Sequence, residues 1–382
     1  GFRVEARGAA YSSCSPLSAH RRWRFFVGWF RRWASWEFWP PWLFYLPLLP
    51  WLFLLAVRYR GAMTVTTVNP GISRFGRFLV NRKSDKLGAL PRRYVPPFIL
   101  LRETDSLAAR LTQARAFATE QGFPVVLKPD IGGRGSGVWI VRTPEGLEHD
   151  ITLVDYDVIL QSFVDGEEYG IFWVRHPGHR RGRIVSITKK DLPFVTGDGL
   201  HSVEQLILSH PRAVCFSRLH LRNLGDHSLE IPASGEIVFI GELGTHSRGA
   251  LFHDGWASYT KELEIELALL TSSLEGFHFG RFDVMIPSAS ALQKGEGLQV
   301  MELNALGAEM THIWDSRLGL RNAWRTLRWQ WHIAYHFGYC NRLRGALVAP
   351  FRKTVQELCE LWELHQRHES ASCRRTSQSV IG

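Results

Sequence analysis

The chain has 382 residues, of which 45% are hydrophobic, a length that allows about two domains and a large core. Its formal net charge of +10 raises the question of nucleic-acid binding. The combination of basic and aromatic residues, however, is concentrated beside one apolar run near the N-terminus, where five arginines lie among tryptophans, so a nucleic-acid partner is not expected. The five cysteines are scattered, odd in number and without a C-x-x-C pair, which indicates neither a zinc site nor a disulfide framework and agrees with a reducing compartment.

The N-terminal region combines arginines, tryptophans and a long apolar run. The arginines before the run are Arg21, Arg22, Arg24, Arg31 and Arg32. The run itself, residues 38–57, has 20 residues without a charge and is long enough to cross a bilayer as a helix. Its four prolines argue against one straight helix, and its tryptophans are of the type found at headgroup level. We expect contact with membrane lipid, as a kinked or re-entrant insertion or as a single span; the alternative is packing against the enzyme or a partner.

A short bridge follows at residues 61–100. Its AMTVTTV stretch, residues 62–68, predicts a strand, and the NPGI that follows predicts a turn. Beyond the turn, the segment NRKSDKLGAL contains Lys83 and Lys86.

Apolar residues at helical spacing predict helices further along the chain. These helices span residues 104–121, with Thr104 or Asp105 as the cap, and residues 260–275, 320–339 and 354–368. A capping-box pattern at Ser202 marks the start of another helix. The alternation of Arg218, His220 and Arg222 is interpreted as the solvated face of a strand, and the polar tail after Glu369 as disordered.

Residues 123–143 read as strand, glycine-rich loop and strand. A short apolar run ends in Lys128, the segment GGRGSG follows at residues 132–137, and a second apolar run closes the unit. Glycines let a backbone approach a phosphate and aim N–H groups at it, and a lysine supplies a point charge to the same anion. A Walker loop is excluded, because there is no GK[ST]. The alternative is a glycine-rich hairpin turn that binds nothing.

Residues 157–164 and 184–191 predict two further strands. The second strand ends in Lys189 and Lys190, either of which could contact a triphosphate or a carboxylate substrate, or remain a solvated pair. A glycine-rich segment with two histidines and an arginine follows at residues 242–254.

The stretch from Gly280 to Asn304 contains two apolar-alternating runs, FDVMI and LQVMELN, joined by a Ser/Ala/Gly/Lys loop. Residues two apart in a strand point to the same side. An antiparallel hairpin therefore gathers Asp283, Glu302 and Asn304 on one face with Arg281 beside them. Hard divalent ions take carboxylate and amide oxygens, whereas the alternative is an ordinary half-exposed strand face.

Taken in order, these motifs resemble the ATP-grasp superfamily of carboxylate–amine ligases, which includes D-alanine–D-alanine ligase and cyanophycin synthetase. The matching pieces are FPVVLKP with GGRGSG, DVILQSFVDGEEYGIFWV, KKDLPFVTGDGLHSVEQLI, GRFDVMIPS and VMELNALGAEMTHIWD. The resemblance runs from about Lys83 to Asp315 and depends on the order of the pieces more than on any single motif. Family ligases carry a longer α/β domain ahead of these motifs, so their substrate recognition does not transfer to this chain.

The resemblance implies a nucleotide site and a metal site. The nucleotide-binding residues would be Lys83, Lys86, Lys128, Gly132, Gly133, Gly135, Ser136, Gly137, Gln161, Ser162, Phe163, Val164, Glu168 and Lys189. Glu167 is the alternative to Glu168 as the acid that binds the ribose hydroxyls. Either Lys83 or Lys86 would reach the phosphates. Asp283, Glu302 and Asn304 would bind Mg²⁺ or Mn²⁺, Arg281 and Lys128 would be catalytic, and Glu309, Thr311 and His312 would line the substrate pocket.

The activity implied is ATP- and Mg²⁺-dependent ligation of a small-molecule or peptide carboxylate to an amine through an acyl phosphate. The alternative is a membrane-associated ATP-binding module with no ligase activity. Because ATP is cytoplasmic, the expected location is the cytoplasmic membrane, with the catalytic domain facing the cytoplasm.

The implied fold class is α+β: an ATP-grasp fold, in which two α/β subdomains grip ATP between them, preceded by the membrane-associated segment. The expected divisions are residues 1–60, the bridge 61–100, an ATP-grasp domain over 101–330, and C-terminal helices with a disordered tail over 331–382.

Overall fold

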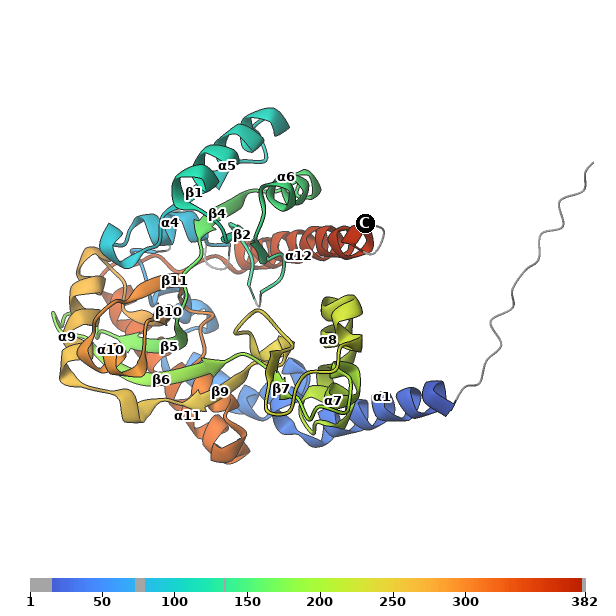
Figure 1. The fold of residues 1–382 in the computed structure, drawn as a ribbon. Helices are drawn as coiled ribbons and strands as arrows, with labels where there is room; N and C mark the ends of the chain where they lie inside the picture. Colours follow the sequence, from blue (N-terminus) through green and yellow to red (C-terminus); the bar gives the residue numbers. More distant parts are fainter. Residues whose placement is uncertain (1–15, 73–79, 134, 380–382) are drawn as a thin grey trace, which may run out of the picture. The chain divides into compact units, whose positions relative to one another are not determined.

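The computed structural model describes residues 16–72, 80–133 and 135–379 (Figure 1). The chain forms two compact units. One contains residues 16–38 and 194–240, and the other contains residues 39–193 and 241–379 of the described chain. These two units do not coincide with the four divisions expected from the sequence, and the four divisions stay a prediction.

The first unit joins the N-terminal helix to an excursion from the middle of the chain. Its elements are α1 (Pro16–Ala34), η1 (Trp36–Phe38), β7 (Phe194–Thr196), α7 (Val203–Ser209), η5 (Ala213–Phe216), α8 (Ser217–Leu224), η6 (Gly225–Leu229) and β8 (Ile237–Phe239). Gly28 lets α1 approach η5 closely, since a Cβ there would lie 2.3 Å from the Val214 carbonyl oxygen. An ion pair of 2.6 Å between Glu37 of η1 and Arg212, the residue before η5, lies next to this contact.

The second unit contains two antiparallel sheets. The first sheet has the order β1-β4-β2-β3, with β1 (Phe98–Leu101), β4 (Val158–Ser162), β2 (Val125–Pro129) and β3 (Trp139–Val141). It packs with α5 (Leu107–Gln121), α6 (Pro144–Leu153) and the long α12 (Phe351–Ser379), as Figure 1 shows. The shared core includes Phe117, Ile151 and Ala371, all buried.

The second sheet has the order β11-β10-β5-β6-β9. Its strands are β5 (Glu167–Val174), β6 (Arg183–Asp191), β9 (Leu251–Asp254), β10 (Phe279–Ile286) and β11 (Gln299–Asn304). One face is buried against α9 (Lys261–Leu270) and α10 (Ala289–Lys294), with Ile171 and Phe282 in that core. On the other face, Phe172 and Phe279 pack in a core with α11 (Leu320–Leu343) and α3 (Leu49–Arg58). The α+β class is therefore confirmed.

The remaining elements of this unit are short. They are α2 (Pro41–Tyr45), η2 (Leu46–Leu48), η3 (Ala62–Thr67), α4 (Lys83–Gly88), η4 (Arg92–Tyr94), η7 (His246–Arg248), η8 (Trp256–Ser258), η9 (Thr271–Ser273), η10 (Thr311–Trp314) and η11 (Ser316–Leu318).

The apolar run is helical but broken into pieces, because prolines occupy the first turn of α2, η2 and α3. The stretch Pro41–Arg58, with mean hydropathy 1.4, meets the length and composition of a membrane span. Phe44, Leu48 and Leu55 on it are nonetheless buried within the protein.

Two predicted strands are wrong. Residues 62–68 form the 3₁₀-helix η3, because threonine hydroxyls there bond to backbone carbonyls, as Thr67 Oγ1 does to Gly338 O at 2.7 Å. Residues 217–224 form the helix α8, in which His220 is buried and its Nδ1 donates to Ile240 O at 2.9 Å.

Several helices also differ from expectation. Helix α5 begins after Ser106, whose side chain accepts from Ala109 N, and neither Thr104 nor Asp105 is the cap. The loop between β10 and β11 contains α10. The tail predicted to be disordered continues α12 to Ser379, since Ala371 is buried and Arg375 bonds Asp150 at 2.8 Å. The capping box at Ser202 is confirmed.

Candidate active site

The hairpin of β10 and β11 pairs as the alternation predicts. Asp283 lies opposite Glu302, and Arg281 lies opposite Asn304. Residues paired across an antiparallel ladder share a face, so the four polar side chains project from the same side of the sheet. Phe282, between the two polar residues of β10, is buried in the core on the other side.

Asp283 is the centre of this group. Arg281 donates from Nε to Oδ1 at 2.8 Å and from Nη2 to Oδ2 at 3.0 Å, and Asn304 Nδ2 donates to Oδ2 at 2.9 Å. Lys190 Nζ lies 2.9 Å from Oδ1. Burial alone would raise the pKa of Asp283, but Arg281 and Lys190 outweigh burial and hold that pKa far below its usual range.

Gly170, opposite Asp283 on β5, leaves room for this arrangement. A Cβ at Gly170 would lie 3.1 Å from Thr311 Oγ1, 3.2 Å from Arg281 Cδ and 3.4 Å from Asp283 Oδ1. Each of these separations is tight or at contact distance, so any side chain at position 170 would press on the Arg281–Asp283 pair.

Strand phase separates two adjacent pairs of charged residues. Glu168 on β5 lies opposite Lys190 on β6, and Lys190 Nζ is 2.7 Å from Glu168 Oε1. Lys189 and Glu167 point to the opposite face and pair with each other at 3.4 Å. The structure thus places Lys190 in the cluster, where Lys189 was predicted, and it places Glu168 there rather than Glu167.

The segment at residues 242–254 lies against this acid. A Cβ at Gly244 would come 2.0 Å from Glu168 Oε2, so the backbone of the segment passes directly over the carboxylate. Burial raises the pKa of Glu168 in spite of the neighbouring Lys190.

Lysines from the first sheet and its neighbouring helix reach the same centre. Lys128 on β2 donates to Gln161 Oε1 at 2.6 Å and to the Met301 carbonyl of β11 at 3.0 Å, which joins the two sheets. Lys83 on α4 donates to Gly132 O at 2.7 Å and lies 3.6 Å from Glu302 Oε1.

These lysines set the charge state around Glu302. Burial lowers the pKa of Lys128 and that of Lys86 to about 8, with the neighbouring Lys83 also lowering both. Burial would raise the pKa of Glu302, but Lys83, Lys86 and Lys128 outweigh it and the pKa is lowered. The sequence left open whether Lys83 or Lys86 reaches the phosphates. In the structure both lysines act electrostatically on Glu302, so both lie at the candidate site.

Asp130, which sequence reasoning passed over, positions Lys83. It is fully buried directly after β2, and its carboxylate accepts from Ser84 N at 2.8 Å and Ser84 Oγ at 3.0 Å. The first turn of α4 is thereby fixed at the end of β2. Its only sequence signal was an aspartate following the apolar run that ends in Lys128.

The glycine-rich loop connects β2 and β3, as predicted. Gly132, Gly135 and Gly137 have positive φ, which glycine adopts without strain. Ser136 Oγ donates to Glu369 Oε1 of α12 at 2.9 Å, and a Cβ at Gly132 would lie 3.1 Å from the ring of the neighbouring His368. Helix α12 therefore lies against the loop. Gly133 has open space around its Cα, and residue 134 lies outside the described residues.

The predicted adenine segment follows β4. Gln161 is buried, and its Nε2 has no hydrogen-bond partner within the described part of the chain. Ser162 N donates to Pro97 O at 3.0 Å, so that amide is already used. Phe163 is 39% exposed and Val164 is half-buried, which leaves their backbone for an adenine edge.

A second polar group borders Arg281. Arg281 Nη1 donates to Glu309 O at 2.9 Å, and Trp314 Nε1 donates to Glu309 Oε2 at 3.0 Å. Burial raises the pKa of Glu309 to about 7. His312 Nδ1 bonds Ser186 Oγ at 2.7 Å.

The buried hydroxyls of Thr188 and Thr311 have no partner among the described residues. Unpaired buried hydroxyls are costly unless a ligand meets them, so this wall fits an oxygen-rich substrate.

Comparisons with known proteins found distant similarities in sequence and in structure. No family model matches the chain. It is 28% identical over 113 residues to the carbamoyl phosphate synthase arginine-specific large chain of Cutaneotrichosporon cutaneum, which covers 28% of this chain and 9% of that protein. It is 23% identical over 230 residues to the cyanophycin synthetase of Geminocystis herdmanii, which covers 53% of this chain and 25% of that protein. The chain thus spans a quarter or less of the two curated relatives.

Among solved structures, the D-alanine–D-alanine ligase of Bacillus anthracis has a TM-score of 0.38 at 16% identity, covering 74% of this chain and 69% of that chain. The same enzyme was also solved with ATP, with a TM-score of 0.34 at 15% identity, covering 64% of this chain and 66% of that chain. The chain is similar to ATP-grasp ligases. The match to cyanophycin synthetase agrees with the resemblance drawn from the motifs, and it covers about half of this chain.

The residues present fit the ATP and the Mg²⁺ that ATP-grasp ligases use. Two carboxylates and an amide on one face, Asp283, Glu302 and Asn304, form the hard oxygen donor set that Mg²⁺ prefers. Lys83 and Lys128 face them from the first sheet and α4, where triphosphate oxygens could take the place of backbone carbonyls as partners.

Proposed function

We propose that the chain is an ATP- and Mg²⁺-dependent carboxylate–amine ligase. The observation that carries the proposal is the paired Asp283 and Glu302 on one sheet, faced by Lys83 and Lys128 from the other side and flanked by Arg281. A structural ion pair would need one cation for each acid, whereas this site has more cations than carboxylates.

Different residues would bind the triphosphate, the ribose and the metal ion. Lys83, Lys86 and Lys128 would hold the triphosphate together with the glycine-loop N–H groups, and Glu168 would accept from the ribose hydroxyls. Mg²⁺ held by Asp283, Glu302 and Asn304 would neutralise phosphate charge and orient the γ-phosphate. The enzyme contributes mainly positioning and charge neutralisation.

The reaction has two steps. A substrate carboxylate oxygen attacks the γ-phosphorus, an O–P bond forms, and the bond from phosphorus to the ADP oxygen breaks. An amine nitrogen then attacks the acyl carbon, phosphate leaves with the C–O bond electrons, and the amine proton passes to solvent or a nearby base. Arg281 lies between the Asp283 carboxylate and the Glu309 backbone, where it can stabilise both the transferring group and the tetrahedral oxyanion.

The test measures ADP and phosphate release with panels of acids and amines, together with product mass. Asp283→Asn and Glu302→Gln should each lower acid-dependent ADP release by at least about 100-fold without unfolding the protein. Glu167→Gln is the matched control, because that carboxylate lies on the opposite face and should leave turnover unchanged. ATP binding by the wild type without any acid-dependent turnover would favour the non-catalytic ATP-binding module.

We further propose that α2 and α3 hold the enzyme on a membrane surface. Apolar side chains exposed on α2, α3 and the intervening η2 recur every three or four residues, at Trp42, Leu46, Leu49, Phe53 and Val57, all between 52% and 68% exposed. This spacing places them along one side. The other side is occupied by the protein, as the 3.1 Å bond from Trp324 Nε1 to Phe44 O illustrates.

A helix that is packed along one side and apolar on the other is suited to lying in the interface plane rather than crossing the bilayer. Vesicle flotation tests this arrangement. Phe53→Ser with Val57→Ser should abolish flotation with phosphatidylglycerol vesicles while ADP release in detergent is unchanged. Flotation equal to that of the wild type would remove the proposal and leave the ligase assignment intact.

A further inference from the structure

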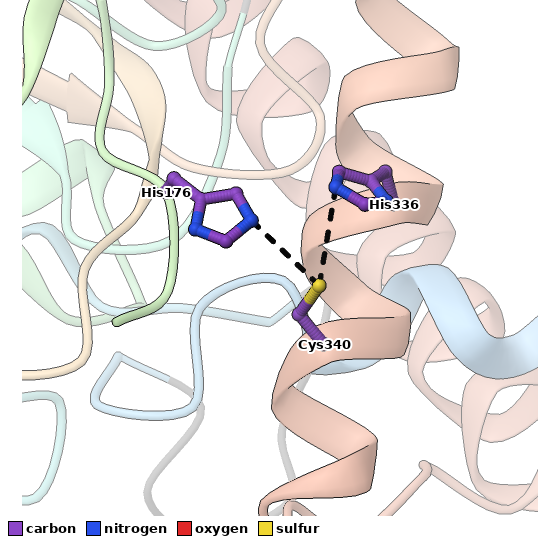
Figure 2. A group of neighbouring side chains, drawn as sticks. All are labelled: His176, His336 and Cys340. Carbon is purple, nitrogen blue, oxygen red and sulfur yellow. Dashed lines mark hydrogen bonds between the residues drawn. The ribbon is translucent and has the colours of Figure 1, made fainter. Parts of the chain in front are cut away.

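A group of two histidines and a cysteine lies apart from the acid cluster. His336 and Cys340 are four residues apart on α11, so they project from adjacent turns of one helix face, and His176 faces them from the loop after β5 (Figure 2). Cys340 Sγ lies 3.8 Å from His176 Nε2 and 4.0 Å from His336 Nε2. All three side chains are half-buried.

These separations match a metal site. Zinc binds cysteine sulfur at about 2.3 Å and histidine nitrogen at about 2.0–2.1 Å, so tetrahedral angles require sulfur and nitrogen to be roughly 3.6 Å apart. The observed distances of 3.8 and 4.0 Å exceed this by a few tenths of an ångström. The three ligand atoms all lie within 4.8 Å of one another, which small side-chain rotations would close onto one ion.

The chemistry of the surroundings agrees. The ring of His176 also packs against the rings of His179 and His336, at centroid distances of 4.7 and 5.5 Å. The Nδ1 of His176 is buried, whereas its Nε2 faces the Cys340 sulfur. Imidazole nitrogen and thiolate sulfur select zinc and softer ions over Mg²⁺.

The group is also remote from the nucleotide site. His176 follows the end of β5, whereas Glu168 is near its beginning, and eight residues of strand span roughly 26 Å. The oxygen donors at Asp283 and the nitrogen and sulfur donors here would therefore be filled independently.

We propose that His176, His336 and Cys340 bind one Zn²⁺ ion, with water in the fourth position. Binding releases the thiol proton of Cys340 and ties the loop after β5 to α11. Because α11 also packs against α3 and η3, the ion would secure the segment that leads out of the apolar run.

The experiment uses the full chain, purified without a histidine tag, stripped with a chelator and titrated with Co²⁺ or Zn²⁺. The wild type should bind one Co²⁺ with a thiolate-to-cobalt charge-transfer band that Zn²⁺ displaces, and Zn²⁺ should raise its Tm. Cys340→Ser should abolish the band, and His336→Gln should weaken Zn²⁺ binding by about 100-fold. Cys359→Ser, exposed on α12, is the matched control and should change neither.

The outcomes separate this site from the proposed ligase site. Asp283→Asn should keep the cobalt band although it loses ADP release. A wild type that binds Zn²⁺ no more tightly than Cys340→Ser would overturn the proposal, as would a cobalt band that survives that substitution. Selective Cu⁺ binding without Zn²⁺ binding would overturn the choice of metal.

Discussion

The division between the two faces of β6 predicts opposite consequences for two adjacent lysines. Lys190 has a side chain 5% exposed and contacts both Glu168 and Asp283, whereas the side chain of Lys189 is 35% exposed and pairs with Glu167 and Asp191. Removing the charge of Lys190 should therefore impair both turnover and folding. Removing that of Lys189 should do neither.

The expected sizes follow from burial. Lys190→Gln leaves Glu168 without its ion pair, although Asp283 keeps Arg281, and breaking a buried pair in this way costs about 3 kcal/mol. Part of that cost is relieved when Glu168, whose pKa burial already raises, takes up a proton. Lys189→Gln removes half-exposed pairs worth at most about 1 kcal/mol. Turnover should fall by on the order of 100-fold for Lys190→Gln.

The assay is coupled ADP release under saturating substrates, with urea unfolding followed in parallel by far-ultraviolet circular dichroism. Lys190→Arg serves as the conservative variant and should recover part of the stability, because the charge remains. Equal loss of activity in Lys189→Gln and Lys190→Gln would refute the assignment of faces and with it the site. Loss of stability without loss of turnover in Lys190→Gln would make that lysine purely structural.

Three other results are expected. Gly170→Ala should lower turnover roughly tenfold and cost about 1–3 kcal/mol, because the new Cβ would lie 3.1 Å from Thr311 Oγ1 and 3.2 Å from Arg281 Cδ and would displace Arg281 from its pair with Asp283; unchanged kinetics would contradict this. Burial lowers the pKa of Lys128 and that of Lys86 to about 8, and the triphosphate requires both charges, so ATP affinity, measured by calorimetry, should be constant below pH 7 and fall above pH 8. A shallower fall in Lys128→Met would assign part of the effect to Lys128, and an unchanged fall would contradict its role. Glu369→Gln should lower the KM for ATP several-fold, since a carboxylate on the glycine loop opposes phosphate, whereas the exposed Glu363→Gln on the same helix should not.

The hairpin could be predicted from the sequence because its signal is local. Alternation with period two in two short runs places Asp283 and Glu302 on one face whatever surrounds them. The glycine loop and the capping box at Ser202 are local in the same sense. The choice between Lys189 and Lys190 was not local. It depends on the register in which β6 pairs with β5, because that register places Lys190, and not Lys189, opposite Glu168.

Other features could not be predicted from the sequence because they depend on contacts between segments far apart in the chain. His176 and Cys340 are 164 residues apart, so neither spacing nor composition points to them, and scattered cysteines argued against a zinc site. The packing of α12 on the glycine loop was missed for a similar reason. The tail after Glu369 is polar in sequence, and nothing in that sequence indicates that Ala371 is buried. The prediction for residues 62–68 was wrong for a different reason. A run of β-branched residues favours a strand, but hydrogen bonds from the threonine hydroxyls to backbone carbonyls favour a 3₁₀-helix here.

The charge balance of the site argues for an anionic ligand rather than a structural ion network. Five cations gather around four carboxylates; the cations are Lys83, Lys86, Lys128, Lys190 and Arg281, and the carboxylates are Asp130, Glu168, Asp283 and Glu302. Burying such an excess costs free energy that folding alone does not recover. The lowered pKa values of Lys86 and Lys128 record that cost. A polyphosphate with its divalent ion would offset the excess, and it would do so where the two sheets meet through Lys128 and Met301.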